Sequence, residues 1–415
     1  MPVEHADPVA SVALALAVIL VAAKVGAELA ARLGQPAVLG ELVIGVILGN
    51  LPHLGYAGLD YLAGDPSIDM LARIGVLILL FEVGLESTVA QMMKVGLTSS
   101  LVAVIGVIVP FGLGWGVSAL LLPGASGYVH AFIGATLSAT SVGITARVLR
   151  DLGRSQTDEA RVILGAAVID DVLGLVILAV VSSVIVAADA GHGVALGGVA
   201  LTVGKAAAFL VGALFLGVKL SPRLFSLASR LRSRGVLLGL GLAFCFALSY
   251  LSSLIGLAPI VGAFAAGLIL EDLHYRDFVA RGEHGLEELI HPISGFLVPV
   301  FFVLMGMRVD LSAFGRADVL GFAAVLTLAA VIGKQACALG VLGGNLDRLS
   351  IGLGMVPRGE VGLIFANIGL SLTLGGAALV DRSTFSAIVA MVIVTTMVTP
   401  PALKWSLSRR RAGSV

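Results

Sequence analysis

Long apolar runs separated by short polar segments dominate the sequence. The runs are about 20 residues long, which is the length an α-helix needs to cross a bilayer. They lack the period of two that the strands of a membrane β-barrel would show. The pattern therefore predicts about thirteen membrane-spanning helices, at 8–31, 36–52, 69–86, 96–121, 128–149, 160–186, 195–219, 235–254, 258–271, 289–307, 318–343, 348–375 and 383–404.

The composition supports an integral membrane protein. The 415 residues are 58% hydrophobic and 13% charged, far from the average of soluble domains. Lysine and arginine together number 26, as do aspartate and glutamate, so the net charge gives no sign of a nucleic-acid partner and we expect none. We expect an all-α polytopic protein whose residues 1–415 form a single membrane domain in the lipid bilayer, with 405–415 as a short cytoplasmic tail.

Basic residues are concentrated in alternate loops, and this predicts the orientation. By the positive-inside rule, loops rich in lysine and arginine face the cytoplasm. The loops around 53–68, 122–127, 187–194 and 255–257 contain neither residue, although Arg308, Arg316 and Arg382 are minor exceptions on that side. The N-terminus is therefore expected outside and the C-terminus in the cytoplasm. The basic residues that define the cytoplasmic side are Arg32, Lys94, Arg147, Arg150, Arg154, Arg161, Lys219, Arg223, Arg230, Arg232, Arg234, Arg276, Arg281, Arg348, Lys404 and Arg409–Arg411.

Two of the predicted spans carry residues that interrupt a helix. The fifth contains several hydroxyl residues and a glycine at 136–145, and the twelfth contains a proline and several glycines at 352–362. Interrupted helices at corresponding places in two halves indicate the midplane site of a transporter. The fifth and twelfth spans are seven spans apart, and an odd number means that they cross the membrane in opposite directions. We therefore expect inverted repeats at 36–186 and 258–404, with linker helices at 187–254.

Asp170 and Asp171 stand next to each other inside an apolar run. Arg161 precedes them by about nine residues, which places them roughly 13 Å deep. Charges at such depth are costly and are kept where they face protein or water and have a function. Because neighbouring helical positions point about 100° apart, two different roles are favoured over one shared role. Either carboxylate could bind a cation or a proton; a misplaced helix end is the simpler alternative.

Lys334 is a third charge inside a span, midway between Asp318 and Asp347. A buried lysine requires an acidic partner, so we expect an ion pair with Asp170 or Asp171. The pair could serve transport or structure alone, and the sequence does not separate these two roles.

Arg358 and Glu360 lie at the interruption of the twelfth span. We favour a structural role for them, in which their charges satisfy the ends of the two half-helices and the carbonyl groups that are freed there. Thr140, Ser141 and Thr145 supply hydroxyl groups at the interruption of the fifth span.

Five motifs together resemble bacterial sodium/proton antiporters of the NapA-like branch of the monovalent cation:proton antiporters. They cover almost the whole membrane domain in the family's order. They are GAAVIDDVLGL, ATSVGITARVL, GLAPIVGAF, GK and PRGEVGLI, at 165–175, 139–149, 256–264, 333–334 and 357–364.

The resemblance implies a thirteen-helix, NhaA-like fold with two inverted five-helix repeats, two broken helices that cross, a dimerisation domain and a mobile core. It implies that Asp171 binds the cation, as the site of the transported metal ion Na+, and that Asp170 pairs with Lys334 when no cation is bound. Thr140 and its neighbours then flank the site. In this family an Asp-Asp pair accompanies electrogenic exchange.

From the residues and the resemblance together we expect a secondary transporter, not an enzyme, without a cofactor. It would exchange Na+ or Li+ for H+ by alternating access, as a homodimer in the bacterial inner membrane, and so serve pH homeostasis. A K+/H+ antiporter is the alternative within this superfamily. An intramembrane aspartyl protease is a remote alternative, because its two carboxylates must come from different helices to share one proton.

Overall fold

The computed structural model describes residues 8–412, apart from 55–58, 87–95, 153, 155–156, 191–195, 229–230, 232, 234, 256, 271–283 and 344–345. The chain forms two compact units, which are described separately. Unit 1 comprises residues 1–89 and 205–309, and unit 2 comprises residues 90–204 and 310–415. Each predicted repeat contributes to both units, since 36–186 and 258–404 are each divided between them. The repeat relationship and the single membrane domain stay predictions.

Every expected span overlaps a helix, or two helices where we expected an interruption. In the described part of the chain, seven helices are long and apolar enough to cross a membrane: α1, α5, α8, α10, α13, α14 continued by η5, and α17. Shorter apolar helices are α2, α11 and α16. The structure is thus a helical membrane protein, and the number of thirteen crossings stays a prediction.

Unit 1 is built from helices that approach one another closely. Its elements are α1 (Pro8–Arg32), α2 (Ala37–Gly49), η1 (Leu51–Leu54), η2 (Asp60–Gly64), α3 (Pro66–Glu86), α10 (Val236–Leu254), α11 (Pro259–Ile269) and α13 (Leu286–Met307). Helix α9 (Leu196–Ala228) contributes its part from Lys205 onward. Helix α13 packs on α2 and α3, α3 packs on α11, and α1 packs on α2.

Glycine makes these close contacts possible. A Cβ atom added to Gly306 of α13 would lie 2.1 Å from the Leu42 carbonyl oxygen, and one added to Gly45 of α2 would lie 2.3 Å from the Val303 carbonyl oxygen. Small residues at such contacts let two backbones approach and gain van der Waals contact, which is the main attraction between helices in lipid.

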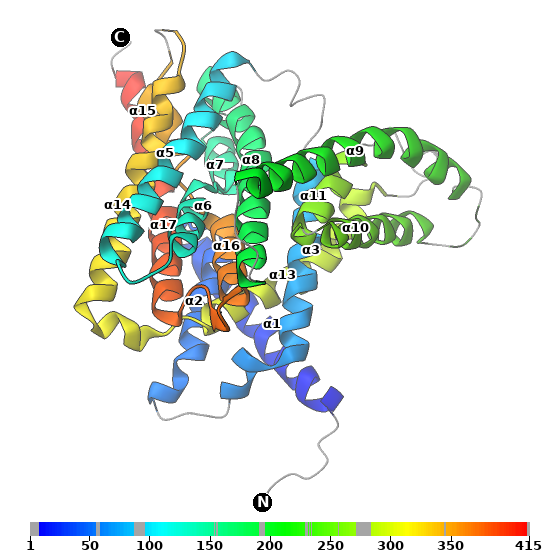
Figure 1. The fold of residues 1–415 in the computed structure, drawn as a ribbon, viewed down its shortest axis with the longest axis horizontal. Coiled ribbons are helices and arrows are strands. Elements are labelled where there is room, and N and C mark those ends of the chain that lie inside the picture. Colours follow the sequence, from blue (N-terminus) through cyan, green and yellow to red (C-terminus); the bar gives the residue numbers. More distant parts are fainter. Residues whose placement is uncertain are drawn as a thin grey trace, which may run out of the picture. The chain divides into compact units, whose positions relative to one another are not determined.

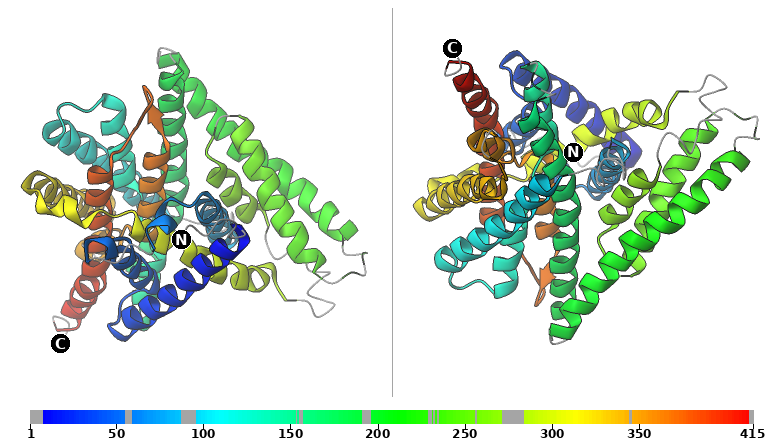
Figure 2. Two further views of the ribbon diagram at one scale, coloured as in Figure 1. Left: turned by 90° about the horizontal axis from the view of Figure 1, so that it is seen from below. Right: turned by 90° about the horizontal axis from the view of Figure 1, so that it is seen from above.

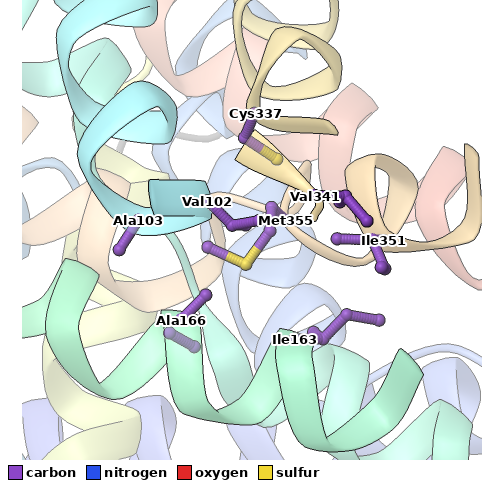
Figure 3. Packing of buried hydrophobic residues seen from close by; sticks show 9 residues of the cluster. Val102, Ala103, Ile163, Ala166, Cys337, Val341, Ile351 and Met355 are labelled. Atoms are coloured by element: carbon purple, nitrogen blue, oxygen red, sulfur yellow. The ribbon is translucent and has the colours of Figure 1, made fainter. Parts of the chain in front are cut away.

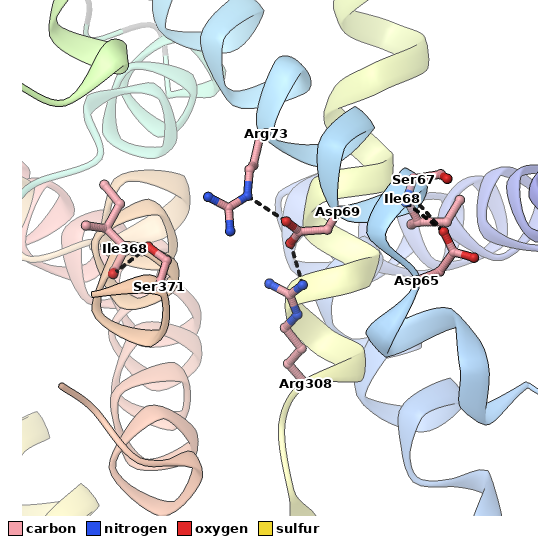
Figure 4. A network of polar contacts seen from close by, with 8 residues as sticks. All are labelled: Asp65, Ser67, Ile68, Asp69, Arg73, Arg308, Ile368 and Ser371. Carbon is pink, nitrogen blue, oxygen red and sulfur yellow. Dashed lines mark hydrogen bonds and ion pairs between the residues drawn. The ribbon is translucent and has the colours of Figure 1, made fainter. Parts of the chain in front are cut away.

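Polar contacts join three elements at one end of unit 1. Asp69, in the first turn of α3, accepts hydrogen bonds from Arg73 at 2.6 Å and from Arg308 at 2.5 Å (Figure 4). The Asn50 side-chain amide, just after α2, donates to the Val309 carbonyl at 2.8 Å. Residues 308 and 309 follow α13 directly, so the end of that helix is held by the end of α2 and the start of α3.

Unit 2 contains the helices around the candidate site. They are α5 (Leu97–Leu121), α6 (Gly127–Ser138), α7 (Val142–Asp151), α8 (Asp158–Asp189), η4 (Leu311–Gly315), α14 (Ala317–Gln335), η5 (Ala336–Gly340), α15 (Arg348–Gly354), α16 (Gly359–Ser371) and α17 (Arg382–Ala412). Helix α5 packs against α6, α8 and α14, while α17 packs against α14, α15 and α16 (Figure 1).

Both expected interruptions are present in unit 2. The fifth span is divided into α6 and α7 by residues 139–141, and the twelfth into α15 and α16 by residues 355–358. Gly359 has φ +41°, and a Cβ atom there would lie 2.5 Å from the Ser141 hydroxyl oxygen. Glycine therefore lets the second interruption approach the first.

A short β-hairpin departs from the expected all-α fold. Strands β1 (Thr373–Leu374) and β2 (Ala377–Ala378) follow α16, whereas the apolar pattern predicted that the twelfth span continues to residue 375. Gly375 and Gly376 both have positive φ, as a two-residue hairpin turn requires. Asp189, at the end of α8, accepts hydrogen bonds from the Thr373 hydroxyl and the Gly375 amide at 2.7 Å each. Figure 2 shows the hairpin, in orange, beside the end of α8.

An apolar cluster lies inside unit 2 between α5, α8, η5 and α15. Its members are at most 2% exposed: Val102, Ala103, Ile163, Ala166, Ala167, Cys337, Val341, Ile351 and Met355 (Figure 3).

Candidate ion-binding site

Lys334 and Asp170 form a buried ion pair in unit 2. The Lys334 ammonium group on α14 donates to the Asp170 Oδ1 atom on α8 at 2.8 Å, and both side chains are 0% exposed. The second carboxylate oxygen of Asp170, Oδ2, is buried without a hydrogen-bond partner. Burying two charges is costly even when they are paired. The Oδ2 atom of Asp170 is therefore a strong hydrogen-bond acceptor that the ion pair does not use.

Glycine leaves room for this pair beside α5. A Cβ atom added to Gly106 would lie 3.7 Å from the Lys334 nitrogen and 3.9 Å from Asp170 Oδ1. It would also lie 3.3 Å from the Cβ atom of Cys337. Helix α5 therefore covers the ion pair with a residue that has no side chain.

Asp171 differs from Asp170 in its surroundings. It is only half-buried, although it is the next residue of the same helix. Neighbouring positions of an α-helix point about 100° apart, so the two carboxylates face different parts of the unit. The structure therefore separates a fully buried, paired carboxylate from a more accessible one.

The two interruptions are joined by hydrogen bonds between their backbones and hydroxyl groups. The Ser141 amide donates to the Pro357 carbonyl at 2.8 Å. The Thr145 hydroxyl donates to the Gly354 carbonyl at 2.6 Å, and the Thr140 hydroxyl lies 3.5 Å from the Met355 carbonyl. Thr140, Ser141 and Thr145 are at most 1% exposed. The broken spans thus satisfy each other's free backbone groups, as burial without water demands.

Arg358 connects this crossing to the helix that carries Lys334. Its guanidinium donates to the Ala139 carbonyl in the first interruption and to the Ala330 carbonyl of α14 at 3.1 Å. The side chain is 0% exposed, and its charge interacts with that of Asp170. These acceptors are main-chain carbonyl groups, and the structural role of Arg358 stays a prediction. Glu360 lies in the first turn of α16, but its side chain is outside the described part of the structure.

The site combines fixed charges with oxygen atoms. Lys334 and Arg358 supply two positive charges, and Asp170 and Asp171 supply two carboxylates on adjoining positions of α8. Small monovalent cations prefer oxygen ligands, and a carboxylate can hold either such a cation or a proton. The arrangement is suited to exchanging one for the other, because occupancy of a carboxylate by a cation excludes its proton.

The charged residues and the interruptions are evident in the sequence, but some of their neighbours are not. Gly106 and Cys337 both stand in apolar runs. The acceptors of Arg358 are main-chain carbonyls of Ala139 and Ala330, whose side chains carry no polar group. A glycine in the middle of a long apolar span is a weak signal, since it also occurs wherever two helices touch.

The fold and the site together define a class of protein. A helical membrane protein whose two interrupted helices meet beside buried charges has the architecture of a secondary transporter. A family model described as "Sodium/hydrogen exchanger, transmembrane" matches residues 15–409, and the chain belongs to this family.

Curated and solved proteins agree with this assignment. The high-affinity Na+/H+ antiporter NhaS3 of Synechocystis sp. is 39% identical, over 95% of this chain and 89% of the relative. The Na+/H+-K+ antiporter GerN of Bacillus cereus is 35% identical, over 95% and 96%. The solved sodium proton antiporter MjNhaP1 of Methanocaldococcus jannaschii has a TM-score of 0.68 at 16% identity, with 94% of each chain covered. The resemblance to bacterial sodium/proton antiporters is therefore confirmed.

Proposed function

We propose that this protein exchanges Na+ or Li+ for H+ electrogenically by alternating access. The observation that carries the proposal is the buried Lys334–Asp170 pair next to the half-buried Asp171, within the unit that holds both broken helices. The names of NhaS3 and GerN support Na+/H+ exchange as the activity. We further propose a homodimer in the bacterial inner membrane, with the N-terminus outside and the C-terminus in the cytoplasm, that serves pH homeostasis.

Asp171 is the proposed seat of the transported cation. A partly dehydrated Na+ or Li+ and a proton compete for its carboxylate. A proton taken up from the external side displaces the cation, and the protonated site then returns toward the cytoplasm. Competition at one carboxylate is sufficient to couple the two fluxes, because the site changes its access from one side of the membrane to the other with either the cation or the proton bound.

Asp170 and Lys334 are proposed to supply the additional proton. Asp170 releases Lys334 when the cation binds, and the freed ammonium group loses a proton because a buried, unpaired charge is costly. When the cation leaves, Lys334 takes up a proton again and re-forms the 2.8 Å pair. More than one proton then moves per cation, which makes the exchange electrogenic.

The polar groups of the two interruptions are proposed to hold the site in shape. Thr140, Ser141 and Thr145 in and after the first interruption form hydrogen bonds to the second. Arg358 donates a hydrogen bond to a carbonyl group of the crossing. Glu360 is proposed to stabilise the start of α16, where a carboxylate interacts favourably with the helix dipole.

The decisive experiment is Asp171→Asn in proteoliposomes that carry a proton gradient and an internal pH dye. Cation-induced dequenching should fall to the level of empty liposomes, because an amide can neither hold the proton nor neutralise the cation. Asp189→Asn is the matched control, since Asp189 ends the same helix and stays bound to the hairpin through its Oδ1 atom. Exchange retained by Asp171→Asn would overturn the assignment of the cation seat.

Lys334→Gln tests the electrogenic step separately. The amide can still donate to Asp170, but it cannot gain or lose the proton. We expect residual exchange with a reduced dependence on membrane potential, measured as current on a solid-supported membrane. Unchanged charge movement per cation would make Lys334 a structural residue only.

A K+/H+ antiporter is the second candidate, and the name of GerN, which includes K+, favours keeping it. Replacing Na+ by K+ in the same liposome assay separates the two activities. Membership of an exchanger family places the chain among transporters, so nothing supports the intramembrane protease that we considered from the sequence.

A further inference from the structure

The apolar cluster of unit 2 adjoins the Lys334–Asp170 pair on one side. Residues three or four apart lie on the same face of a helix, one turn from each other. Ala166 and Ala167 precede Asp170 by this spacing, and Cys337 follows Lys334 by it. Val102 and Ala103 precede Gly106, the residue of α5 beside the pair, in the same way. Three separate elements thus place buried apolar residues one turn from the pair.

These elements all place the cluster toward the same end of the unit. It lies toward the start of α5, the start of α8 and the end of α14, each of which the positive-inside rule assigns to the cytoplasm. The cluster reaches from Ala166 back to Ile163 on α8 and from Cys337 on to Val341. Ile163 lies seven positions before Asp170, which corresponds to about 10 Å along a helix.

The side chain of Met355 fills the middle of the cluster. Figure 3 shows it reaching from the second interruption toward Val102 of α5 and Ala166 of α8. Met355 and Val102 are 0% exposed. The opposite side of the pair has a different character, since there Arg358 binds the Ala330 carbonyl one turn before Lys334. The ion pair therefore has an apolar wall on one side and polar groups on the other.

We propose that this apolar cluster is a proton-tight seal within unit 2, which keeps the Lys334–Asp170 pair from exchanging protons with the cytoplasm through the unit itself. This inference rests on the proposed function. An apolar constriction excludes water and hence the hydrogen-bonded chain that protons require. With this seal in place, protons on the ion pair reach the cytoplasm only when unit 2 moves. The coupling between proton and cation transport depends on the seal.

Two isosteric substitutions test the seal. Val102→Thr and Val341→Thr keep the shape of each side chain and add a hydroxyl group near each end of the cluster. We expect the double variant to show a several-fold faster passive decay of a pH gradient in proteoliposomes without Na+, Li+ or K+, with fewer cations moved per proton when Na+ is added. Val392→Thr is the positional control, because Val392 is 1% exposed in the same unit and packs on Gly362 outside the cluster.

A second pair of variants separates polarity from packing. Val102→Ala with Val341→Ala loosens the cluster but leaves it apolar, and apolar cavities stay dry. This variant should be less stable than the wild type yet should hold the gradient equally well. If the threonine variant does not fold, Cys337→Ser and Cys337→Ala test the same contrast between polarity and packing, because serine and alanine differ by one oxygen atom.

The outcomes distinguish the seal from the proposed function. A wild type that exchanges Na+ for H+, together with a threonine variant that leaks no more than Val392→Thr, overturns the seal alone. Equal leaks in the threonine and alanine variants also overturn it, because packing rather than polarity would then matter. A wild type without exchange in the same liposomes overturns the proposed function, independently of the leak measurement.

Discussion

Unit 1 and unit 2 are both helical, but they bury different kinds of residues. Among the described residues, the charged side chains buried in unit 2 are Glu159, Asp170, Lys334 and Arg358, whereas in unit 1 the buried charge is Glu41. Glycines bring backbones together in both units: a Cβ atom on Gly267 of unit 1 would lie 2.2 Å from the Phe81 carbonyl oxygen, and one on Gly134 of unit 2 would lie 2.6 Å from the Phe111 carbonyl oxygen. The units therefore differ in the charges that they bury.

This difference shows how the two units are stabilised. Backbones that touch through glycine gain van der Waals contact where the helices cross. Buried charges are stable only where partners surround them, and the interruptions of unit 2 supply carbonyl and hydroxyl groups as partners. The unit with interrupted helices can therefore hold a site that carries charge.

The largest predicted effect concerns the ion pair of unit 2. Lys334→Met leaves the 0% exposed Asp170 without its donor, and breaking one side of a buried pair costs roughly 3–5 kcal/mol. Thermal unfolding of the purified protein in detergent measures the loss. Asp170→Leu combined with Lys334→Met is the control, and it should restore most of the stability without any transport. A double variant as unstable as the single one would show that packing, not charge, holds this part of unit 2.

A smaller effect is expected for the close glycine contacts within unit 1. Gly306→Ala should cost about 1–3 kcal/mol, the usual range for overpacking, because the new methyl group would lie 2.1 Å from the Leu42 carbonyl oxygen. Gly321→Ala on α14 meets no atom within 4 Å and should leave stability nearly unchanged. Equal melting temperatures for the two variants would argue against close backbone contact at Gly306.

The smallest effect concerns the bond that joins the two interruptions. Thr145→Val should cost about 1 kcal/mol, because the Gly354 carbonyl at the end of α15 loses the hydroxyl that donates to it at 2.6 Å. Thr136→Val is the matched control: Thr136 is equally buried, but it donates to Phe132 within its own helix. Chemical denaturation of both variants measures the difference. The same loss in both would mean that the bond between the broken spans adds nothing beyond a local hydroxyl contact.

Much of the fold could be predicted from the apolar pattern. The run at 160–186 corresponds to α8, Asp158–Asp189, and the run at 235–254 to α10, Val236–Leu254. Hydrophobic length locates such helices because the bilayer sets it. The pattern was wrong at the end of the twelfth span, where apolar residues at 373–378 form a hairpin. Hydropathy does not distinguish these residues from a helix; the turn depends on the positive φ of Gly375 and Gly376.

The candidate site was predictable to the extent that its residues carry charge. Asp170, Asp171 and Lys334 are conspicuous in the sequence because a charge inside an apolar span needs a reason. From the residues alone, either aspartate could have been the partner of Lys334. The choice of Asp170 depends on the rotation of α8 relative to α14, and only the packed structure decides it.

Chain length, hydropathy and charge are local properties, and they were enough to predict a polytopic helical membrane protein with two interrupted spans and three deep charges. Three features became known only from the packed structure: Gly106 gives the ion pair its space, Arg358 joins the crossing to α14, and an apolar cluster borders one side of the pair. These features depend on contacts between segments distant in sequence. The sequence of one segment does not predict these features, because they are formed by a glycine without a side chain, by main-chain carbonyl groups and by ordinary apolar residues.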